Sequence, residues 1–254
     1  MAPFRQVDLL GMRVADVDSR RLLDHVFAEL EAGRGGWIVT ANLDILRRYA
    51  IDADARALYD AADIRVADGM PLVWASRIAG SPLPERVAGS SLTMALAERA
   101  AREGRSIYLL GGAPGAAEGC RAELERRFAG LEIVGTSSPM VSVPTPWPEA
   151  EAIAETIGGA PDIILVGLGS PKQEHLIQKL KRRFPKAWLM GVGITFSFVA
   201  GEVSRAPEWM QRAGVEWVHR MVQEPGRLVR RYLVEDLPFA AVLFGSSVAK
   251  RLRR

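Results

Sequence analysis

Short runs of hydrophobic residues alternate along the chain with longer segments in which hydrophobic positions recur every three or four residues. The short runs show no regular exchange of apolar and polar positions, which is typical of strands buried on both faces of a parallel sheet. They predict six strands, at residues 36–40, 63–68, 106–110, 131–134, 163–166 and 187–190. The longer segments predict helices at residues 42–62, 69–78, 90–103, 116–128, 149–157 and 171–184. The alternation indicates an α/β fold with a Rossmann-like, mostly parallel sheet and helices on both of its faces.

The pattern changes near the C-terminus. The alternation of strands and helices stops at about Gly201, and the rest of the chain has only helical patterns. We therefore expect an α/β core in residues 1–200 and a helical appendage in residues 201–254. One long irregular stretch, residues 136–148, is rich in Ser and Pro, and we interpret it as an exposed crossover or a mobile lid.

The composition is that of a globular protein, with 254 residues, 48% of them hydrophobic and 25% charged. It excludes the disordered, collagen-like and coiled-coil classes. The single cysteine, Cys120, excludes a disulfide scaffold and is typical of a reducing compartment. The N-terminal residues lack the basic and apolar regions of a signal peptide, so we expect a cytoplasmic protein.

The positive charge is concentrated in the tail. The whole chain has a formal net charge of +3, whereas residues 221–254 hold seven basic and three acidic residues, a balance of +4. The first 220 residues therefore sum to −1. A basic surface over the whole protein is not indicated, and we expect no nucleic acid partner.

An apolar segment, residues 237–249, precedes the last basic residues of the chain. As a helix, thirteen residues are about 20 Å long, which is shorter than the hydrocarbon core of about 30 Å. We therefore expect this segment to lie on the anionic inner leaflet of the cell membrane, held by the flanking arginines, and not to cross it. The alternative is a C-terminal helix that packs on the sheet or on another subunit.

Two glycine-rich turns follow predicted strands and open directly into helices. Backbone N–H groups and the positive end of a helix dipole suit a phosphate or diphosphate there, although glycine also serves tight turns without any ligand. In an open parallel sheet such turns lie at the carboxyl edge, where ligands bind. Neither turn has the Gly-Lys-Ser/Thr of a Walker A loop or a complete dinucleotide fingerprint. The candidate binding residues in them are Gly111, Gly112, Gly169, Gln173 and Glu174.

Other polar residues at these strand ends have two interpretations each. Asp68 follows the second predicted strand, where a carboxylate with a tuned pKa serves as a general base and where Asp also commonly caps the next helix. Gln173 contacts a substrate or closes a capping box with Ser170. Thr40 and Asn42 bind a sugar hydroxyl or cap the helix that follows them. The three histidines are scattered, so we expect no metal site.

Three arginines of the tail are candidates for a diphosphate site. If residues 217–232 form one helix, Arg220, Arg227 and Arg230 lie within about 80° of one another on one face. Guanidinium groups suit diphosphate oxygens because their planar forks match this geometry. Pro225 predicts a break in the helix.

Taken together, these segments resemble the WecG/TagA/CpsF glycosyltransferases, family 26 of the sequence-based classification. The resemblance covers roughly residues 37–232. It rests on ordered blocks: Thr-Ala-Asn at 40–42, Val-Ala-Asp-Gly at 66–69, Leu-Pro-Glu-Arg-Val-Ala-Gly-Ser at 83–90, Leu-Leu-Gly-Gly at 109–112, Val-Gly-Leu-Gly-Ser-Pro-Lys-Gln-Glu at 166–174, Arg-Ala-Pro-Glu-Trp-Met-Gln at 205–211, Glu-Trp at 216–217 and Gln-Glu-Pro at 223–225.

The resemblance implies transfer of a hexosyl group from a UDP-sugar, such as UDP-glucose or UDP-N-acetylmannosamine, to a polyprenyl-diphosphate-linked sugar. It places this reaction at the inner face of the membrane, in exopolysaccharide or cell-envelope synthesis. It implies inversion at the anomeric carbon without a metal or other cofactor, and a homo-oligomer whose change to a monomer gates activity. It implies that Asp68 is the general base. The residues that it implies for substrate binding are Thr40, Asn42, Arg86 and Gln173 in the cleft, and Arg220, Arg227 and Arg230 in the appendage.

The chain departs from the family pattern at Ser197, where many members have an acid. The change removes a hydrogen-bond acceptor for the ribose or the sugar. The resemblance therefore favours the branch that transfers a glucosyl group over the N-acetylmannosaminyl branch. A second hypothesis stays open: a non-catalytic, nucleotide-sensing module that binds UDP-sugar and whose tail recruits a partner.

Overall fold

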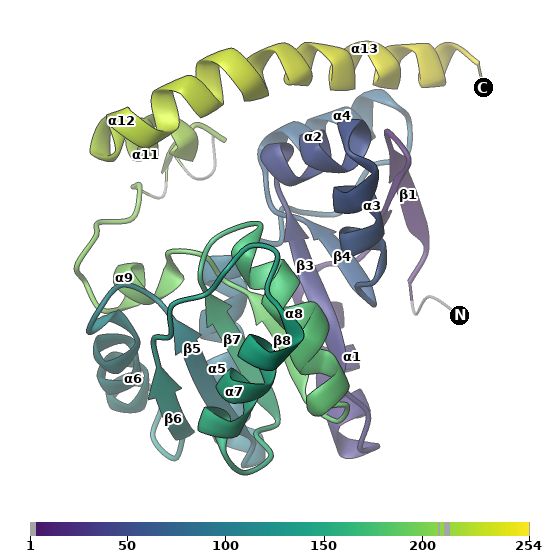
Figure 1. Ribbon diagram of the computed structural model, residues 1–254. Helices are drawn as coiled ribbons and strands as arrows, with labels where there is room; N and C mark the ends of the chain where they lie inside the picture. Colours follow the sequence, from purple (N-terminus) through teal and green to yellow (C-terminus); the bar gives the residue numbers. More distant parts are fainter. Residues whose placement is uncertain (1–3, 208, 211–213, 254) are drawn as a thin grey trace.

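Six parallel strands form the centre of the molecule in the computed structural model, which describes residues 4–207, 209–210 and 214–253 (Figure 1). In order across the sheet they are β4 (Ile64–Ala67), β3 (Gly36–Ala41), β8 (Trp188–Gly191), β7 (Ile163–Gly167), β5 (Ser106–Gly111) and β6 (Glu132–Ser137). All neighbouring strands pair in parallel. Each strand lies within three residues of a predicted one, so the predicted α/β fold is confirmed.

Helices cover both faces of the sheet because successive strand residues point to opposite sides. Val39 and Leu189 belong to one buried cluster, whereas Ile38 and Met190 belong to another. The helices packed in the first cluster are α2 (Leu43–Ile51), α3 (Ala53–Asp60), α4 (Met70–Ile78), α7 (Trp147–Ile157) and α8 (Lys172–Arg183). Those in the second are α1 (Ser19–Glu31), α5 (Gly89–Glu103), α6 (Ala116–Arg127) and α9 (Thr195–Val199).

The N-terminal segment contains elements that the hydrophobic pattern does not predict. Strands β1 (Gln6–Leu9) and β2 (Met12–Ala15) form an antiparallel hairpin, and helix α1 follows them. Each strand has only four residues, which is too short for a clear period. Their turn holds Leu10 and Gly11 at positive φ, 50° and 89°.

The helix predicted at residues 42–62 is two helices in the structure. Helix α2 ends at Ile51, and Asp52 adopts an extended conformation. The Asp52 carboxylate accepts hydrogen bonds from the N–H groups of Asp54 and Ala55, at 2.9 and 3.3 Å. This side-chain cap starts α3 in a new direction, so the single helix is wrong.

The predicted irregular stretch is shorter than expected. Strand β6 runs to Ser137 and helix α7 begins at Trp147. Between them, the side chains of Val141 and Thr145 are buried. The segment is therefore a crossover from β6 to α7 that packs on the core.

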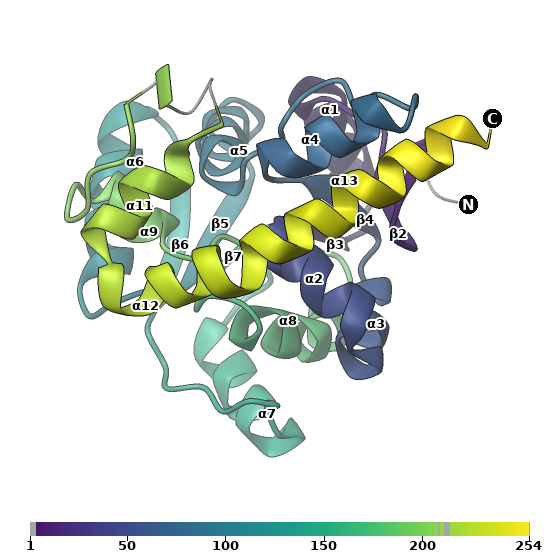
Figure 2. The ribbon, with the colours of Figure 1, turned by 90° about the horizontal axis from the view of Figure 1, so that it is seen from above.

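The C-terminal part of the chain is a series of helices: α11 (Glu216–Gln223), α12 (Pro225–Val229), the π-helical η1 (Arg230–Asp236) and α13 (Leu237–Leu252). The break predicted at Pro225 is confirmed. Arg220 and Arg230 therefore lie on different helices, and the single arginine face considered above does not form. From α12 onward the chain runs as one long rod across α2 and α4 (Figure 2).

Helix α13 packs against the core of its own chain. The side chains of Phe239 and Leu243 are buried in the same cluster as residues of α2 and α4. Lys250 Nζ donates to the carboxylate of Asp8 at 2.9 Å. One side of the tail helix is therefore packed on the core of its own chain. Its other side carries exposed hydrophobic residues, Val242, Val248 and Leu252.

The tail helix is longer than its apolar segment suggests. Residues 230–252 form one continuous helical segment of 23 residues, which by length and composition could cross a membrane. At about 1.5 Å per residue it exceeds the roughly 30 Å of a hydrocarbon core. The expected length of thirteen residues is therefore wrong, because the polar residues before Leu237 are also helical. The length of the tail helix therefore does not exclude a membrane-spanning segment.

Candidate active site

A cavity of about 650 Å³ lies at the carboxyl ends of five neighbouring strands, β4, β3, β8, β7 and β5. Parallel strands place these ends at one edge, and the glycine turns after them leave room for a ligand. Residues of the last helices, Glu216, Arg220 and Arg231, close its outer side. The predicted site residues that the structure brings together in its wall are Thr40, Asn42, Asp68, Gly112, Gly169, Gln173 and Arg220.

A second cavity, of about 330 Å³, lies between the core and the tail. Its wall is largely apolar and aromatic, with Met70, Trp74, Trp217, Tyr232, Leu237 and Phe244. The residues that line both cavities are Asn42, Asp68, Glu216, Arg220 and Arg231. A polar cavity and an apolar cavity therefore meet around Asp68.

Asp68 is held in place by a helix that begins 21 residues later in the chain. The N–H of Gly89, at the start of α5, donates to Asp68 Oδ2 at 3.0 Å. A Cβ on Gly89 would lie 3.2 Å from Thr40 Oγ1 and 3.6 Å from Asp68 Oδ2, so glycine permits this close approach. Helix α4 starts after Gly69 without a side-chain cap, so the interpretation of Asp68 as the cap of α4 is wrong.

The surroundings of Asp68 favour its protonated form. Burial raises the pKa of this carboxyl above its ordinary value. The Gly89 N–H and the charges of Arg86 and Arg220 act in the opposite direction. When it is ionised, Asp68 is therefore a stronger base than an exposed aspartate.

The two other polar residues on the β3 side have different roles. Asn42 Oδ1 accepts a hydrogen bond from the N–H of Ile45 at 3.0 Å and caps α2. Its capping interpretation is therefore confirmed, although the residue also lines both cavities. Thr40 stands beside Gly89 in the wall of the larger cavity.

Gln173 joins the turns after β7 and β8. Its Oε1 accepts hydrogen bonds from the N–H of Gly169 at 3.2 Å and of Gly193 at 3.0 Å. Its Nε2 donates to Glu174 Oε1 at 2.9 Å, which orients the amide. A Cβ on Gly191 would lie 2.4 Å from Nε2, so this side chain fits only against glycine. Gln173 thus positions the two turns that form the floor of the cavity.

Neighbouring residues complete this arrangement. Ser170 does not cap α8; its Oγ lies 3.0 Å from the hydroxyl of Tyr59, so the capping box is wrong. Glu174 is buried beside Gln173, and burial raises the pKa of its carboxyl. Gly111 lies behind the cavity wall, where a Cβ would come within 2.8 Å of the Leu168 side chain. Ser170 lines the larger cavity, whereas Glu174 and Gly111 support the site from outside it.

The tail arginines are placed differently from one another. Arg220 lines both cavities, whereas the side chain of Arg230 is 84% exposed and lines neither. Arg227 lies on α12, and its side chain is outside the part of the molecule that the structure describes. Arg231, which sequence reasoning missed, lines both cavities. The sequence offers no signal that distinguishes it from Arg230.

Arg86 and Glu216 connect the core to the tail. Arg86 lines the smaller cavity, and its Nη1 donates to Glu216 Oε2 at 2.9 Å. Arg205 Nε lies 3.9 Å from the other oxygen of Glu216. Glu216 was also missed as a site residue, although it belongs to the Glu-Trp block at 216–217. This pair fixes α11 over the site.

The position of Gln173 predicts the effect of an isosteric change. Gln173→Glu removes the donor to Glu174 and places a second carboxylate beside this buried one. We expect the free energy of unfolding to fall by about 1–3 kcal/mol at about pH 8. The loss should shrink at about pH 5.5. A carboxyl whose pKa is raised in the folded state makes the free energy of unfolding fall as the pH rises, and at low pH this carboxyl is protonated.

Urea unfolding at the two pH values measures this effect. Gln178→Glu, on a half-exposed side of the same helix, is the matched control and should change stability by less than about 0.5 kcal/mol. Equal effects of the two variants would show that Gln173 does not bridge the turns.

Comparison with known proteins identifies the family of this chain. The sequence pattern of the "Glycosyl transferase WecG/TagA/CpsF family" matches residues 7–253. One relative, from Bacillus spizizenii (strain ATCC 23059 / NRRL B-14472 / W23), is named N-acetylglucosaminyldiphosphoundecaprenol N-acetyl-beta-D-mannosaminyltransferase. It is 31% identical over 226 residues, which cover 89% of this chain and 84% of the relative. The chain therefore belongs to the WecG/TagA/CpsF family of glycosyltransferases.

Proposed function

We propose that this protein transfers a hexosyl group from a UDP-sugar to a polyprenyl-diphosphate-linked sugar, with inversion and without a bound metal. The observation that carries the proposal is the place of Asp68, where a polar cavity and an apolar cavity meet. The name of the Bacillus relative supports the acceptor class, because that enzyme acts on a sugar linked to undecaprenol through a diphosphate.

The larger cavity suits the donor. Its floor is made of glycine turns, among them Gly112, Gly169 and Gly193, whose backbone approaches a ligand without hindrance from side chains. Arg220 adds a positive charge at its outer side. Backbone dipoles and a guanidinium are the groups that a leaving diphosphate needs when no metal neutralises it.

The smaller cavity suits the acceptor. Trp74 and Trp217 present flat apolar faces, on which a sugar ring packs well, and Leu237 and Phe244 continue the apolar wall along α13. A lipid tail attached to such a sugar would leave along the helix. The acceptor hydroxyl would then reach the donor at Asp68.

The reaction follows from this arrangement as a single displacement. Asp68 takes the proton of the acceptor hydroxyl, and the oxygen forms a bond to the anomeric carbon. The bond from that carbon to the diphosphate oxygen breaks, and its electron pair leaves with UDP. One attack from the face opposite the leaving group inverts the anomeric carbon.

Two donors are compatible with the comparisons and the sequence. The name of the Bacillus relative supports N-acetylmannosamine. Ser197 lines the donor cavity where many family members have an acid, which favours glucose. We propose UDP-glucose or UDP-N-acetylmannosamine as the donor, in exopolysaccharide or cell-envelope synthesis.

We also propose that the tail holds the protein on the cytoplasmic face of the membrane, as a peripheral appendage. Val242, Val248 and Leu252 are exposed on the side of α13 that faces away from the core. Arg253 at its end suits anionic headgroups, at roughly 1 kcal/mol. Such a tail would bring the smaller cavity close to a lipid-linked acceptor.

A transfer assay tests the reaction. Radiolabelled UDP-glucose and UDP-N-acetylmannosamine are offered separately with a short-chain polyprenyl-diphosphate-N-acetylglucosamine. We expect transfer from one of them, with an inverted anomeric carbon by NMR and an unchanged rate in EDTA. Binding of UDP without any transfer would favour the nucleotide-sensing module. Loss of activity in EDTA that manganese restores would refute the metal-free mechanism.

Replacement of Asp68 tests the base. Asp68→Asn should lower kcat by at least about a hundredfold. It should leave the Tm at or above that of the wild type, because burial raises the pKa of this carboxyl and its ionised form costs stability at neutral pH. The wild-type rate should rise with pH as Asp68 loses its proton, and the midpoint of this rise should lie above the ordinary pKa of an aspartate. The rate of the variant should not show this rise.

Asp54→Asn, at an exposed position on α3, is the control and should keep wild-type turnover. Wild-type turnover in Asp68→Asn would remove Asp68 from the mechanism.

Vesicle sedimentation tests the membrane contact. On vesicles with anionic lipid, Val242→Glu should weaken binding at least about fivefold, since it removes an apolar contact worth about 1 kcal/mol or more. Val134→Glu, on the exposed edge strand β6, should bind like the wild type. A high-pH carbonate wash should release the protein. Retention after this wash would show that the 23-residue helical segment crosses the bilayer.

A further inference from the structure

Arg231 occupies the junction of the two cavities but has no role in the mechanism above. It is one of the five residues that line both cavities, together with Asp68 and Arg220. It lies on η1, the π-helical turn between α12 and α13. π-helical turns are rare and are frequent at functional sites. The position of Arg231 and its π-helical backbone therefore both indicate a functional residue.

The π-helical turn brings each of the two adjacent arginines close to an acid of the same turn. Arg231 Nε lies 3.6 Å from Asp236 Oδ2, and Arg230 Nε lies 4.0 Å from Glu235 Oε1. Both pairs join residues five positions apart. In an α-helix such residues point about 140° away from each other, whereas the i→i+5 turn brings them to one side. Adjacent residues of a helix point in different directions, and here the side chain of Arg231 is 26% exposed whereas that of Arg230 is 84% exposed.

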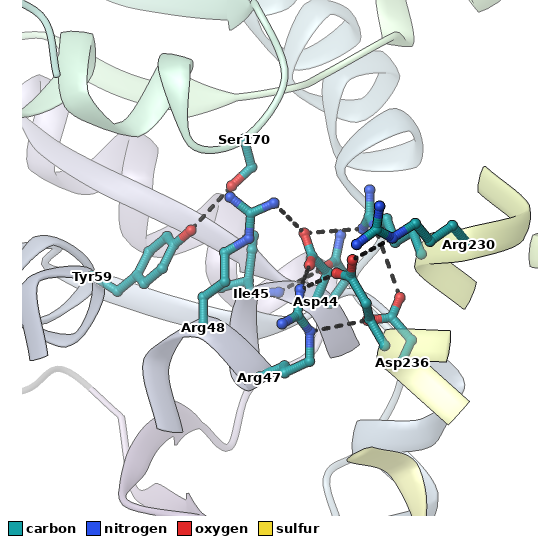
Figure 3. Close-up of polar contacts among 11 residues, drawn as sticks. Asp44, Ile45, Arg47, Arg48, Tyr59, Ser170, Arg230 and Asp236 are labelled. Carbon is teal, nitrogen blue, oxygen red and sulfur yellow. Dashed lines mark hydrogen bonds and ion pairs between the residues drawn. The ribbon is translucent and has the colours of Figure 1, made fainter. Parts of the chain in front are cut away.

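Two buried carboxylates, Asp44 and Asp236, locate the Arg231 guanidinium. Figure 3 shows these two carboxylates with Arg47 beside them. Asp44, at the start of α2, is 1% exposed and lies 3.4 Å from Arg231 Nη2. Asp236, 7% exposed, approaches from the same helical turn. Arg47 and Arg48 also face Asp44, at 2.9 and 3.1 Å, so its charge is shared among three guanidinium groups. The cluster ties the tail to the helix that follows Asn42.

Arg231 differs from Arg47 in how its donors are used. Arg47 Nη2 donates short hydrogen bonds to Asp44 and Glu235, at 2.9 and 2.6 Å. Arg231 is held by ion pairs of 3.4 and 3.6 Å. The buried Nε atoms of both arginines have no hydrogen-bond partner among the described residues, so the two side chains differ at their Nη groups. The carboxylates therefore fix the position of Arg231 and leave it donors for another acceptor.

We propose that Arg231 binds a diphosphate where the two cavities meet, and that Asp44 and Asp236 position it for this purpose. The inference rests on the proposed function and adds a residue to it. A guanidinium presents a planar fork of N–H donors, which matches diphosphate oxygens better than a point charge does. The diphosphate belongs to the UDP leaving group or to the lipid-linked acceptor, since Arg231 faces both cavities.

Binding of UDP and of uridine to the full-length protein tests this role. Arg231→Ala should weaken UDP binding at least about tenfold, because a charge-assisted hydrogen bond is lost. It should leave uridine binding unchanged, because uridine has no diphosphate. Arg231→Lys keeps the charge without the fork and should also bind UDP more weakly. Arg230→Ala, one residue away and exposed, should weaken UDP binding at most about threefold.

Kinetic measurements with the lipid-linked acceptor distinguish the two sources of the diphosphate. If UDP binding is unchanged in Arg231→Ala and the KM for a short-chain polyprenyl-diphosphate-sugar rises at least about tenfold, Arg231 serves the acceptor. If neither changes, the proposal is wrong. If Arg231→Ala also loses uridine binding, its fold is disturbed, and Arg231→Lys then decides: wild-type UDP binding and acceptor KM would overturn the proposal. A wild-type protein that neither binds UDP nor transfers sugar would instead refute the proposed function.

A double-mutant cycle tests the positioning by Asp44. Asp44→Asn should impair the same quantity as Arg231→Ala, which is either the affinity for UDP or the KM for the acceptor. In the Arg231→Ala background it should have little further effect, because the residue that it positions is absent. Additive effects of the two changes would show that Asp44 acts independently of Arg231.

Discussion

The parallel direction of all six strands is the constraint on which the site depends. Because every carboxyl end falls at one edge, groups as far apart in the chain as Thr40 and Ser197 line one cavity. The edge alone supplies backbone dipoles and glycine turns, which suit a nucleotide diphosphate but perform no proton transfer. In the proposed reaction Asp68 adds that function, held by the first N–H of helix α5.

The helices of the tail form the outer wall of the candidate site. Without α11, η1 and α13, the smaller cavity would keep only its core side, which is formed by α4, the start of α2, Asp68 and Arg86. Two sets of charges hold the tail there: Arg86 with Glu216, and the cluster around Asp44. Buried ion pairs contribute little net stability, since desolvation offsets their attraction, but a wrong placement leaves charges unpaired. Their main effect is to specify where the tail lies, and with it where Arg220 and Arg231 stand.

The same tail faces two environments. One side of α13 is packed on α2 and α4, while the other side exposes hydrophobic residues beside terminal arginines. A lipid-linked acceptor has an apolar tail and a charged diphosphate, and the smaller cavity joins an apolar wall to guanidinium groups in the same way. The tail thus relates the geometry of the site to the proposed place of the enzyme at the membrane.

The amino-acid sequence by itself determined the sheet, the covering helices and the strand ends that carry Asp68, Asn42 and the glycine turns, because buried strands and amphipathic helices have periods that can be read locally. It did not reveal the four-residue strands of the hairpin or the cap at Asp52. The tertiary structure decided the partners: Gly89 for Asp68, Gly193 for Gln173 and Glu216 for Arg86. It also decided that Arg231 faces the site and Arg230 faces solvent, because the packing of the tail helix on the core orients its faces, which two adjacent arginines in the sequence do not encode.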